Sequence, residues 1–237
     1  MSREYDQYLT EQLQPLSAEG RVQRNARFAW YRHGTHFPTS SDAAILEIGP
    51  GYGALLDLLY SEHKYTNVHG VDISPEVVRA CNQVVPNSTD LTDDTTAFLC
   101  GRAGSYDLIL MLHVLEHVPK PEAMALLMAV RGALRPGGKL VAEVPNIAHP
   151  LTGGYHRYHD FTHTVGFTDQ SLNFVLRAAG FASVSVYPCK IPRTSAVRAL
   201  QRASQDTVEL VAKILLRLYM PRQSVVLSSV LGACAAV

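Results

Sequence analysis

The sequence predicts an α/β domain with a doubly wound, mostly parallel, seven-stranded sheet, N-terminal helices and a C-terminal helical extension. From residue 43 onward, short apolar runs alternate with amphipathic stretches, as in parallel strands joined by right-handed helical crossovers. The length of 237 residues suits one domain with decorations. Ligands of such sheets bind at the carboxyl edge of the strands, and the unusual residues of this chain all follow strands. We therefore expect the functional site at that edge.

Composition excludes several classes of protein. Lys and Arg together number 21, as do Asp and Glu, so no overall field attracts nucleic acid and we expect no nucleic-acid partner. The four cysteines are widely spaced and form no Cys-x-x-Cys pair, which predicts thiols in a reducing compartment rather than a disulfide frame or zinc ribbon. No apolar signal segment opens the sequence, and no run of 18 apolar residues occurs. These features predict a cytoplasmic protein without a membrane span.

The expected elements follow from hydrophobic periodicity. Residues 1–40 are predicted as a helical cap, with helix over 1–33 and with Leu9, Leu13 and Leu16 on one face. Residues 41–191 form the predicted core. Its strands are expected at 44–48, 67–73, 106–112, 139–144 and 182–187, and its helices at 53–61, from Pro75, at 121–134 and at 171–179. The segment 86–105 is ambiguous, with a weak strand and a short helix near 95–99, and residues 146–167 are expected to form a long histidine-rich loop.

Residues 192–237 are expected to add an amphipathic helix over 192–220 and, at 230–237, a candidate final strand. The apolar residues Val208, Val211, Leu215 and Leu218 share one helical face, and the basic residues Arg198, Arg202, Lys213 and Arg217 share another. The favoured interpretation is a helix packed on the domain with a solvated basic face, because amphipathic helices usually face a core. The alternative is a helix that contacts a membrane surface or a partner, which would place the protein at the inner face of the membrane.

A glycine-rich loop follows the first predicted strand. Glu47 is followed by Gly49, Gly51 and Gly53, and glycines at alternate positions let the backbone turn tightly and approach a ligand closely. The N–H groups of the next helix then face that ligand. The third glycine comes too early for the dinucleotide pattern. Asp72 ends the second strand at the spacing of about 20 residues expected for a carboxylate that binds ribose hydroxyls.

These motifs together resemble those of class I methyltransferases. The run from Ile45 to Gly53 resembles their first motif, and Val71-Asp72-Ile73-Ser74 resembles their ribose-binding turn. The runs 106–109, 115–118 and 134–138 resemble the later motifs in order and spacing, so the resemblance covers about residues 40 to 190. It implies a Rossmann-like fold with S-adenosylmethionine over the glycine loop and its ribose on Asp72. The cofactor contacts implied in this way are Glu47, Gly49, Gly51, Gly53, Asp72, Ile73, His113 and, at the adenine, Asp90 with Asp93 as the alternative.

A second group of polar residues follows the strand at 106–112. His113, Glu116 and His117 stand at positions i, i+3 and i+4, which fall on one face of a helical turn. Mixed imidazole and carboxylate ligands on one turn form half of a metal site. The loop 146–167 starts at the same edge of the sheet and is placed to close over this turn with the histidines His149, His156, His159 and His163.

A narrower resemblance extends this hypothesis. Small-RNA 3′-terminal 2′-O-methyltransferases hold a divalent ion with a Glu-x-x-Glu-His turn and a later histidine that precedes an aromatic–Thr pair by four residues. Glu116, His117 and His163 match that pattern, while His113 replaces the first glutamate. The added nitrogen favours manganese, iron, cobalt or zinc over magnesium. Quinone-biosynthesis O-methyltransferases have a similar Glu-His-Val-Pro turn, and the run 157–168 resembles methyltransferases found with bacterial polysaccharide and glycolipid genes.

The predicted reaction is methyl transfer to a hydroxyl. A metal ion that chelates two neighbouring hydroxyls lowers the pKa of one of them, and His117 or His159 takes the proton. Tyr155, Arg157 and Tyr158 are the expected sugar-binding residues, by hydrogen bonds and ring stacking. The competing interpretation is that the histidines pack or are solvated and hold no metal.

Five functions are compared at this stage. The leading hypothesis is a metal-assisted O-methyltransferase acting on a saccharide or glycolipid hydroxyl, and the second is methylation of a catechol-like quinone precursor. An RNA 3′ end is disfavoured by the neutral charge, because RNA requires a basic groove. A non-catalytic methyltransferase-like binding module is disfavoured by the intact glycine loop and Asp72, and a nicotinamide oxidoreductase by the glycine spacing. The oligomeric state stays open.

Overall fold

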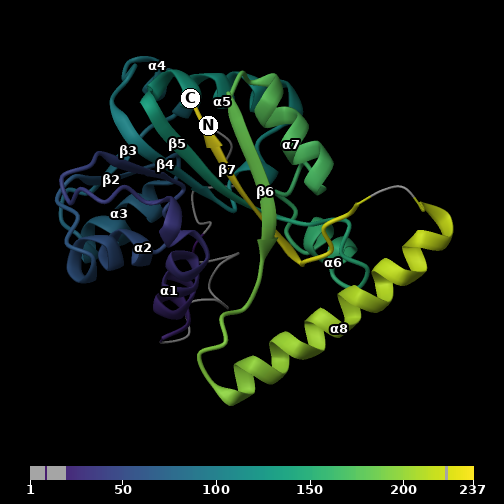
Figure 1. Ribbon diagram of the computed structural model, residues 1–237. Helices are drawn as coiled ribbons and strands as arrows, with labels where there is room; N and C mark the ends of the chain where they lie inside the picture. Colours follow the sequence, from purple (N-terminus) through teal and green to yellow (C-terminus); the bar gives the residue numbers. More distant parts are fainter. Residues whose placement is uncertain (1–8, 10–19, 222–223) are drawn as a thin grey trace.

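The computed structural model describes Leu9, residues 20–221 and residues 224–237. Within this part of the chain, seven strands form one sheet in the order β3-β2-β1-β4-β5-β7-β6 (Figure 1). The strands are β1 (Ile45–Ile48), β2 (Val68–Asp72), β3 (Thr89–Leu91), β4 (Tyr106–Leu112), β5 (Leu134–Pro145), β6 (Ser183–Cys189) and β7 (Val230–Ala236). The first five run parallel, and β7 is antiparallel to both of its neighbours. The predicted fold class is confirmed.

Helices cover both faces of the sheet. They are α1 (Arg21–His33), α2 (Ala54–Asp57) with its continuation Leu58–Glu62, α3 (Pro75–Val84), α4 (Thr95–Cys100), α5 (Lys120–Ala133), α6 (Gly153–Tyr158), α7 (Asp169–Ala178) and α8 (Ala196–Tyr219). Helices α4, α5 and α7 share one apolar core with the sheet, while α1, α2 and α3 bury apolar side chains on its other face (Figure 1). The sheet is therefore buried on both sides, as its continuous apolar strands require.

Local capping explains where several helices begin. Pro75 opens α3, and Oγ of Ser74 accepts a hydrogen bond from the N–H of Val77 at 3.4 Å. Thr168 and Ser171 form a reciprocal capping box at the start of α7. Asp94 caps α4 by accepting from the N–H of Ala97 at 3.0 Å. The ambiguous segment 86–105 thus contains the weak strand and the short helix that were expected.

Some predicted boundaries are wrong. The strand expected at 139–144 begins at Leu134, because Leu134 pairs with Tyr106 before the register shifts. The segment 146–167 contains a helix, α6, rather than loop alone. In the N-terminal region, α1 begins at Arg21, and the predicted apolar positions Leu13 and Leu16 lie outside the described residues. Leu9 is buried, and its N–H donates to Oε2 of Glu76 at 2.9 Å.

The C-terminal extension departs most from the favoured expectation. Helix α8 joins β6 to β7 and projects from the body of the domain (Figure 1). Its predicted apolar face is not packed on the domain, since Val211, Leu215 and Leu218 are 51%, 54% and 76% exposed. The strand predicted at 230–237 is confirmed as β7, which lies inside the sheet between β5 and β6.

The composition predicts neither a disulfide frame nor a membrane span. All four cysteines are free, namely Cys81, Cys100, Cys189 and Cys234. Among the described helices, none combines the length and apolar character needed to cross a bilayer.

Candidate active site

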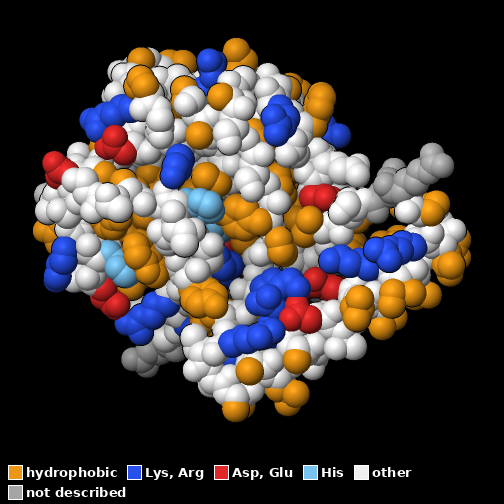
Figure 2. All heavy atoms as spheres, viewed as in Figure 1, with side chains coloured by type: hydrophobic (Ala, Val, Ile, Leu, Met, Phe, Trp, Pro, Cys, Tyr) orange, Lys and Arg blue, Asp and Glu red, His pale blue; other side chains and the backbone are white. Residues whose placement is uncertain are grey.

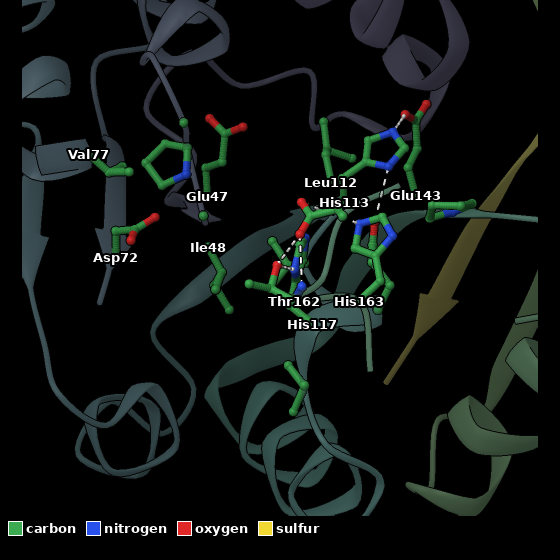
Figure 3. A pocket seen from close by; sticks show the side chains of 18 of the residues that line it. Glu47, Ile48, Asp72, Val77, Leu112, His113, His117, Glu143, Thr162 and His163 are labelled. Atoms are coloured by element: carbon green, nitrogen blue, oxygen red, sulfur yellow. Dashed lines mark hydrogen bonds and ion pairs between the residues drawn. The ribbon is translucent and has the colours of Figure 1, made fainter. Parts of the chain in front are cut away.

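A cavity of about 1500 Å³ opens at the carboxyl edge of β1, β2 and β4. Its walls come from the glycine loop after β1, the ends of β2 and β4, helix α1 and the loop 159–164. Figure 3 shows Glu47 and Asp72 on one side of this cavity and the histidines His113, His117 and His163 on the other. The carboxyl edge predicted for the functional site is where the structure places these residues.

The glycine loop is shaped by left-handed backbone. Gly49 has a φ of +72°, and a Cβ at this position would lie 2.6 Å from Cγ2 of Val114, so only glycine fits. Gly51, with a φ of +57°, also lines the cavity, while Gly53 caps the start of α2 and is outside the wall. The backbone of Gly49 and Gly51 is therefore directly accessible to a ligand.

Two carboxyl groups face this half of the cavity. Glu47 is 4% exposed, its Oε2 has no hydrogen-bond partner among the described residues, and burial raises the pKa of Glu47 to about 8. Burial also raises the pKa of Asp72 to about 6, although Oδ1 accepts from the N–H of Ser74 at 2.7 Å. Such carboxyl groups match the donors of a ligand that carries an ammonium group and ribose hydroxyls. Ile73 lines the cavity beside them.

The adenine-side acid is the weakest of the sequence expectations. Asp90 lies on β3, a short edge strand, where its side chain is exposed and outside the cavity wall. The structure therefore does not bring Asp90 to the cavity, and its contact with adenine stays a prediction. Asp93, the alternative, does line the cavity, next to the capping residue Asp94.

On the other side, Glu116, His117 and His163 converge. Each offers one ligand atom, and these atoms all lie within 4.8 Å of one another. Oε2 of Glu116 is buried and has no hydrogen-bond partner among the described residues. The carbonyl oxygen of Glu116 accepts from the N–H groups of Thr164 at 2.8 Å and Val165 at 3.0 Å, which holds the later loop over the 3₁₀ turn Leu115–His117. A turn after β4 and a distant loop thus meet as the motif spacing predicted.

Hydrogen bonds set the tautomers of both histidines. Oγ1 of Thr162 donates to Oδ1 of Asp160 at 2.6 Å, so it accepts the proton of Nδ1 of His117, which lies 2.8 Å away. Nδ1 of His163 donates to the carbonyl oxygen of His156 at 2.6 Å. In both rings Nε2 then carries the lone pair that a metal ion needs. Burial lowers the pKa of His117, which favours this neutral form.

His113 does not belong to this cluster. It has a φ of +58°, and its ring lies between two carboxylates, with Nδ1 3.2 Å from Oε1 of Glu116 and Nε2 3.4 Å from Oε2 of Glu143. Desolvation lowers the pKa of His113, but the hydrogen bonds to these two carboxylates outweigh it and raise the pKa above its ordinary value. His113 is therefore not among the residues whose ligand atoms converge, and the structure places it in the cavity wall between the two carboxylates.

Sequence reasoning missed Glu143 and its partners. Glu143 lies within the buried part of β5 and is 1% exposed, and its carboxylate binds the guanidinium of Arg32, with one contact at 2.8 Å, and Nε2 of His33 at 2.6 Å. Glu143, His33 and Cys189 also place potential ligand atoms within 4.8 Å of one another. The available signal was a carboxylate inside an otherwise apolar strand, which must find a partner when it is buried.

Helix α6 turns the expected sugar-binding residues away from the cavity. Tyr155 and Tyr158 are 67% and 80% exposed and, like Arg157, lie outside its wall. The guanidinium of Arg157 donates to the carbonyl oxygens of His163 and Thr164, so it positions the loop instead. The structure therefore places these three residues outside the cavity wall, because a helix presents only part of its surface inward. His159 stays in the wall, stacked on Tyr155.

Solved structures share this architecture. An S-adenosylmethionine-dependent methyltransferase from Archaeoglobus fulgidus matches with a TM-score of 0.67 and 19% identity, covering 91% of this chain and 94% of that one. A phosphoethanolamine N-methyltransferase 2 from Haemonchus contortus, solved with S-adenosyl-L-methionine, matches with a TM-score of 0.61 and 16% identity over 98% of this chain and 59% of that one. At such identities the likeness establishes the fold.

Curated relatives are more similar in sequence. A ubiquinone biosynthesis O-methyltransferase from Xanthomonas axonopodis pv. citri (strain 306) is 29% identical over 138 residues, which cover 50% of this chain and 56% of the relative. A protein of the same name from Xanthomonas campestris pv. campestris (strain B100) is 28% identical over the same length. The chain thus spans about half the length of these relatives. The family model described as a methyltransferase domain matches residues 4–186, so the chain belongs to the methyltransferase domain family.

Proposed function

We propose that the chain is an S-adenosylmethionine-dependent O-methyltransferase that uses a divalent metal ion to methylate a hydroxyl group. The observation that carries the proposal is the cluster of Glu116, His117 and His163, in which a buried carboxylate oxygen has no hydrogen-bond partner among the described residues. This cluster shares one cavity with the glycine loop and Asp72. A site for a methyl donor and a site for a hydroxyl therefore adjoin.

The first half of the cavity fits the donor. Gly49 and Gly51 leave room for a ligand against the backbone, and Asp72 accepts hydrogen bonds from ribose hydroxyls. The buried carboxyl of Glu47 suits the ammonium group of the amino-acid end. When bound, the cofactor supplies a methyl group on a positively charged sulfur, which is a good leaving group. The work of these residues is to orient the donor and exclude water.

The second half fits a divalent cation. Two imidazole nitrogens and one carboxylate oxygen suit manganese, iron, cobalt or zinc better than magnesium. Glu116, His117 and His163 would hold the ion, and a bound ion lowers the pKa of an acceptor hydroxyl. Asp160 and Thr162 keep the ring of His117 in the required tautomer. His159, in the same wall, is the candidate base for the hydroxyl proton, and His117 takes that role in a metal-free enzyme.

Two acceptor classes are proposed. The proposal of a saccharide or glycolipid acceptor rests on the local resemblance of residues 157–168. Tyr155, Arg157 and Tyr158 add no support to it, because they lie outside the cavity wall. The proposal of a catechol-like quinone precursor rests on a separate observation, the similarity to ubiquinone biosynthesis O-methyltransferases. Both acceptors present neighbouring hydroxyls, so metal binding alone does not distinguish them.

Calorimetry tests the proposal directly. Divalent metals are titrated into chelator-treated protein that is saturated with S-adenosylhomocysteine, for the wild type, Glu116→Ala, His163→Ala and the control Glu122→Ala, an exposed acid of the same cavity. We expect tight binding that only the first two variants abolish, followed by metal-dependent methylation of a sugar or a catechol. Wild-type protein that binds no metal, or full turnover by Glu116→Ala and His163→Ala in chelator, would reject metal assistance.

A further inference from the structure

The segments that flank helix α8 in the sequence line the wall of the cavity. Lys190 and Ile191, which precede it, and Ser229 and Val230, which follow it, all line the cavity wall. The helix itself spans Ala196–Tyr219 and lies beside the body of the domain (Figure 1). The chain on either side of α8 thus connects the helix to the cavity wall.

Both acidic residues of α8, Asp206 and Glu209, form ion pairs on the inner side of the helix. Lys190 forms ion pairs with Asp206 and, at 3.0 Å, with Oε2 of Glu209. Arg202 also binds Asp206, and it donates to the carbonyl oxygen of Ile191 at 3.1 Å. Glu209 is the only described residue of α8 that is fully buried. Polar contacts, and not an apolar core, thus fasten this side of the helix to the cavity wall.

The outer side of α8 is apolar and exposed. Leu200, Leu210, Ile214 and Leu218 are 70%, 58%, 56% and 76% exposed. Further exposed apolar residues of the helix are Val197, Val208, Val211, Leu215 and Tyr219. Figure 2 shows hydrophobic side chains along the outer edge of α8, with charged side chains between the helix and the body. A continuous apolar strip of this kind on a surface helix marks a binding face.

The charges beside this strip have one sign. Between residues 207 and 219 the exposed side chains include Lys213 and Arg217 and no acid, because Glu209 is buried against Lys190. Long basic side chains can lie along apolar surface while their charged ends reach water or an anionic group. Apolar residues on one face with cations at its border characterise helices that lie in the plane of a membrane interface.

We propose that α8 binds the surface of an anionic lipid bilayer, with its outer face among the headgroups and its basic border on lipid phosphates. The positive charges of Lys213 and Arg217 beside the apolar strip favour an anionic bilayer, since anionic lipids attract each nearby Lys or Arg. The proposal is independent of methyl transfer, because it rests on the helix alone.

Vesicle sedimentation tests it with the full-length protein. The wild type is mixed with vesicles that contain phosphatidylglycerol and with vesicles of phosphatidylcholine alone. We expect binding to the anionic vesicles that weakens with salt, and roughly tenfold to thirtyfold weaker binding by the double variant Lys213→Gln/Arg217→Gln. The matched control is Lys64→Gln/Arg177→Gln, which removes two exposed cations elsewhere and keeps wild-type binding.

A second pair of variants tests the apolar strip. Ile214→Glu/Leu218→Glu changes only exposed positions, and circular dichroism checks that it is folded; we expect it to lose vesicle binding. The control Met128→Glu/Phe174→Glu alters two exposed apolar residues of α5 and α7 and retains it. Wild-type protein that ignores anionic vesicles, or Ile214→Glu/Leu218→Glu that still binds them, overturns the proposal. Analytical ultracentrifugation that shows a dimer lost in Ile214→Glu/Leu218→Glu, without vesicle binding, would assign the strip to a second copy.

Discussion

Oγ1 of Thr162 lies 2.8 Å from Nδ1 of His117 and directs the lone pair of that ring to Nε2. The hydroxyl can only accept this proton, because it donates its own to Oδ1 of Asp160 at 2.6 Å. Two residues that are not themselves candidate ligands therefore prepare a nitrogen for a metal ion.

Thr162→Val should weaken metal binding without removing a ligand. Valine keeps the shape of threonine but cannot accept the Nδ1 proton, so the ligand tautomer of His117 is no longer enforced. We expect roughly tenfold to hundredfold lower affinity for divalent metal by calorimetry. The control Thr66→Val alters an exposed threonine away from the cavity and should leave the affinity unchanged. Equal affinities for Thr162→Val and the wild type would show that the tautomer does not matter.

Gly49→Ala should damage the cofactor loop more than Gly51→Ala. Both glycines have positive φ, which costs an alanine about 1 kcal/mol. At Gly49 the new Cβ would also lie 2.6 Å from Cγ2 of Val114, whereas no atom of the described residues lies within 4 Å of a Cβ at Gly51. Such overpacking adds about 1–3 kcal/mol to the loss of unfolding free energy, measurable by urea titration.

The double variant Gly49→Ala/Val114→Ala separates these two causes. It removes the methyl groups that the new Cβ would meet, so it should recover stability relative to the sum of the two single variants. Affinity for S-adenosylhomocysteine should follow the same order, with Gly51→Ala the least affected. Simple additivity of the two substitutions would argue against the clash.

Glu47 should make the ligand-free protein less stable as the pH rises. Its folded pKa of about 8 lies above the ordinary value of 4.5, so the folded state binds the proton more tightly than the unfolded state. The stabilisation is complete below about pH 4.5 and is lost as the pH rises through about 8. Glu47→Gln carries no titrating group here, so its unfolding free energy should fall less steeply over that range. Glu122→Gln, at an exposed acid, should keep the wild-type slope.

Glu143→Gln should unfold more easily than the wild type. The variant leaves the cation Arg32 and the ring of His33 without their buried carboxylate, and breaking such a pair costs about 3–5 kcal/mol. Burial alone would raise the pKa of Glu143, but hydrogen bonds from His113 and His33 and the charge of Arg32 hold it well below its ordinary value. The stabilisation is therefore present above about pH 4.5 and is lost only as the pH falls through the lower folded pKa.

Urea titrations at neutral and acidic pH check this prediction. Glu62→Gln is the control, because the pair of Glu62 with Arg27 is exposed and such pairs contribute about 0–1 kcal/mol. A Glu143→Gln protein as stable as Glu62→Gln would mean that the buried network contributes little.

The fold was largely predictable because periodicity and turn residues act locally. The apolar run of β4 and the Pro75 start of α3 are read directly from neighbouring residues, and both are found in the structure. The position of β7 inside the sheet was not predictable, because pairing with β5 and β6 depends on residues far away in the sequence.

Some residues of the site were likewise predictable from the sequence, and others were not. Glu116 and His163 were found through motif spacing, and the structure brings them together. Glu143 was missed because its partners Arg32 and His33 come from a helix more than a hundred residues earlier. Tyr155 and Tyr158 were expected to face the site, but the run that contains them forms a short helix and both side chains are exposed.

Strand β7 is the last described element of the chain, and this order affects how the domain folds. Among the described strands, β6 pairs only with β7, and β7 follows α8 in the sequence. A growing polypeptide that has emerged as far as α8 therefore lacks the partner of β6, together with Ser229 and Val230 of the cavity wall. Pairing across this long excursion has to wait for loop closure, so it is expected among the slower steps of assembly. The wall beside α8 would then be completed last, after the parallel strands that hold the glycine loop.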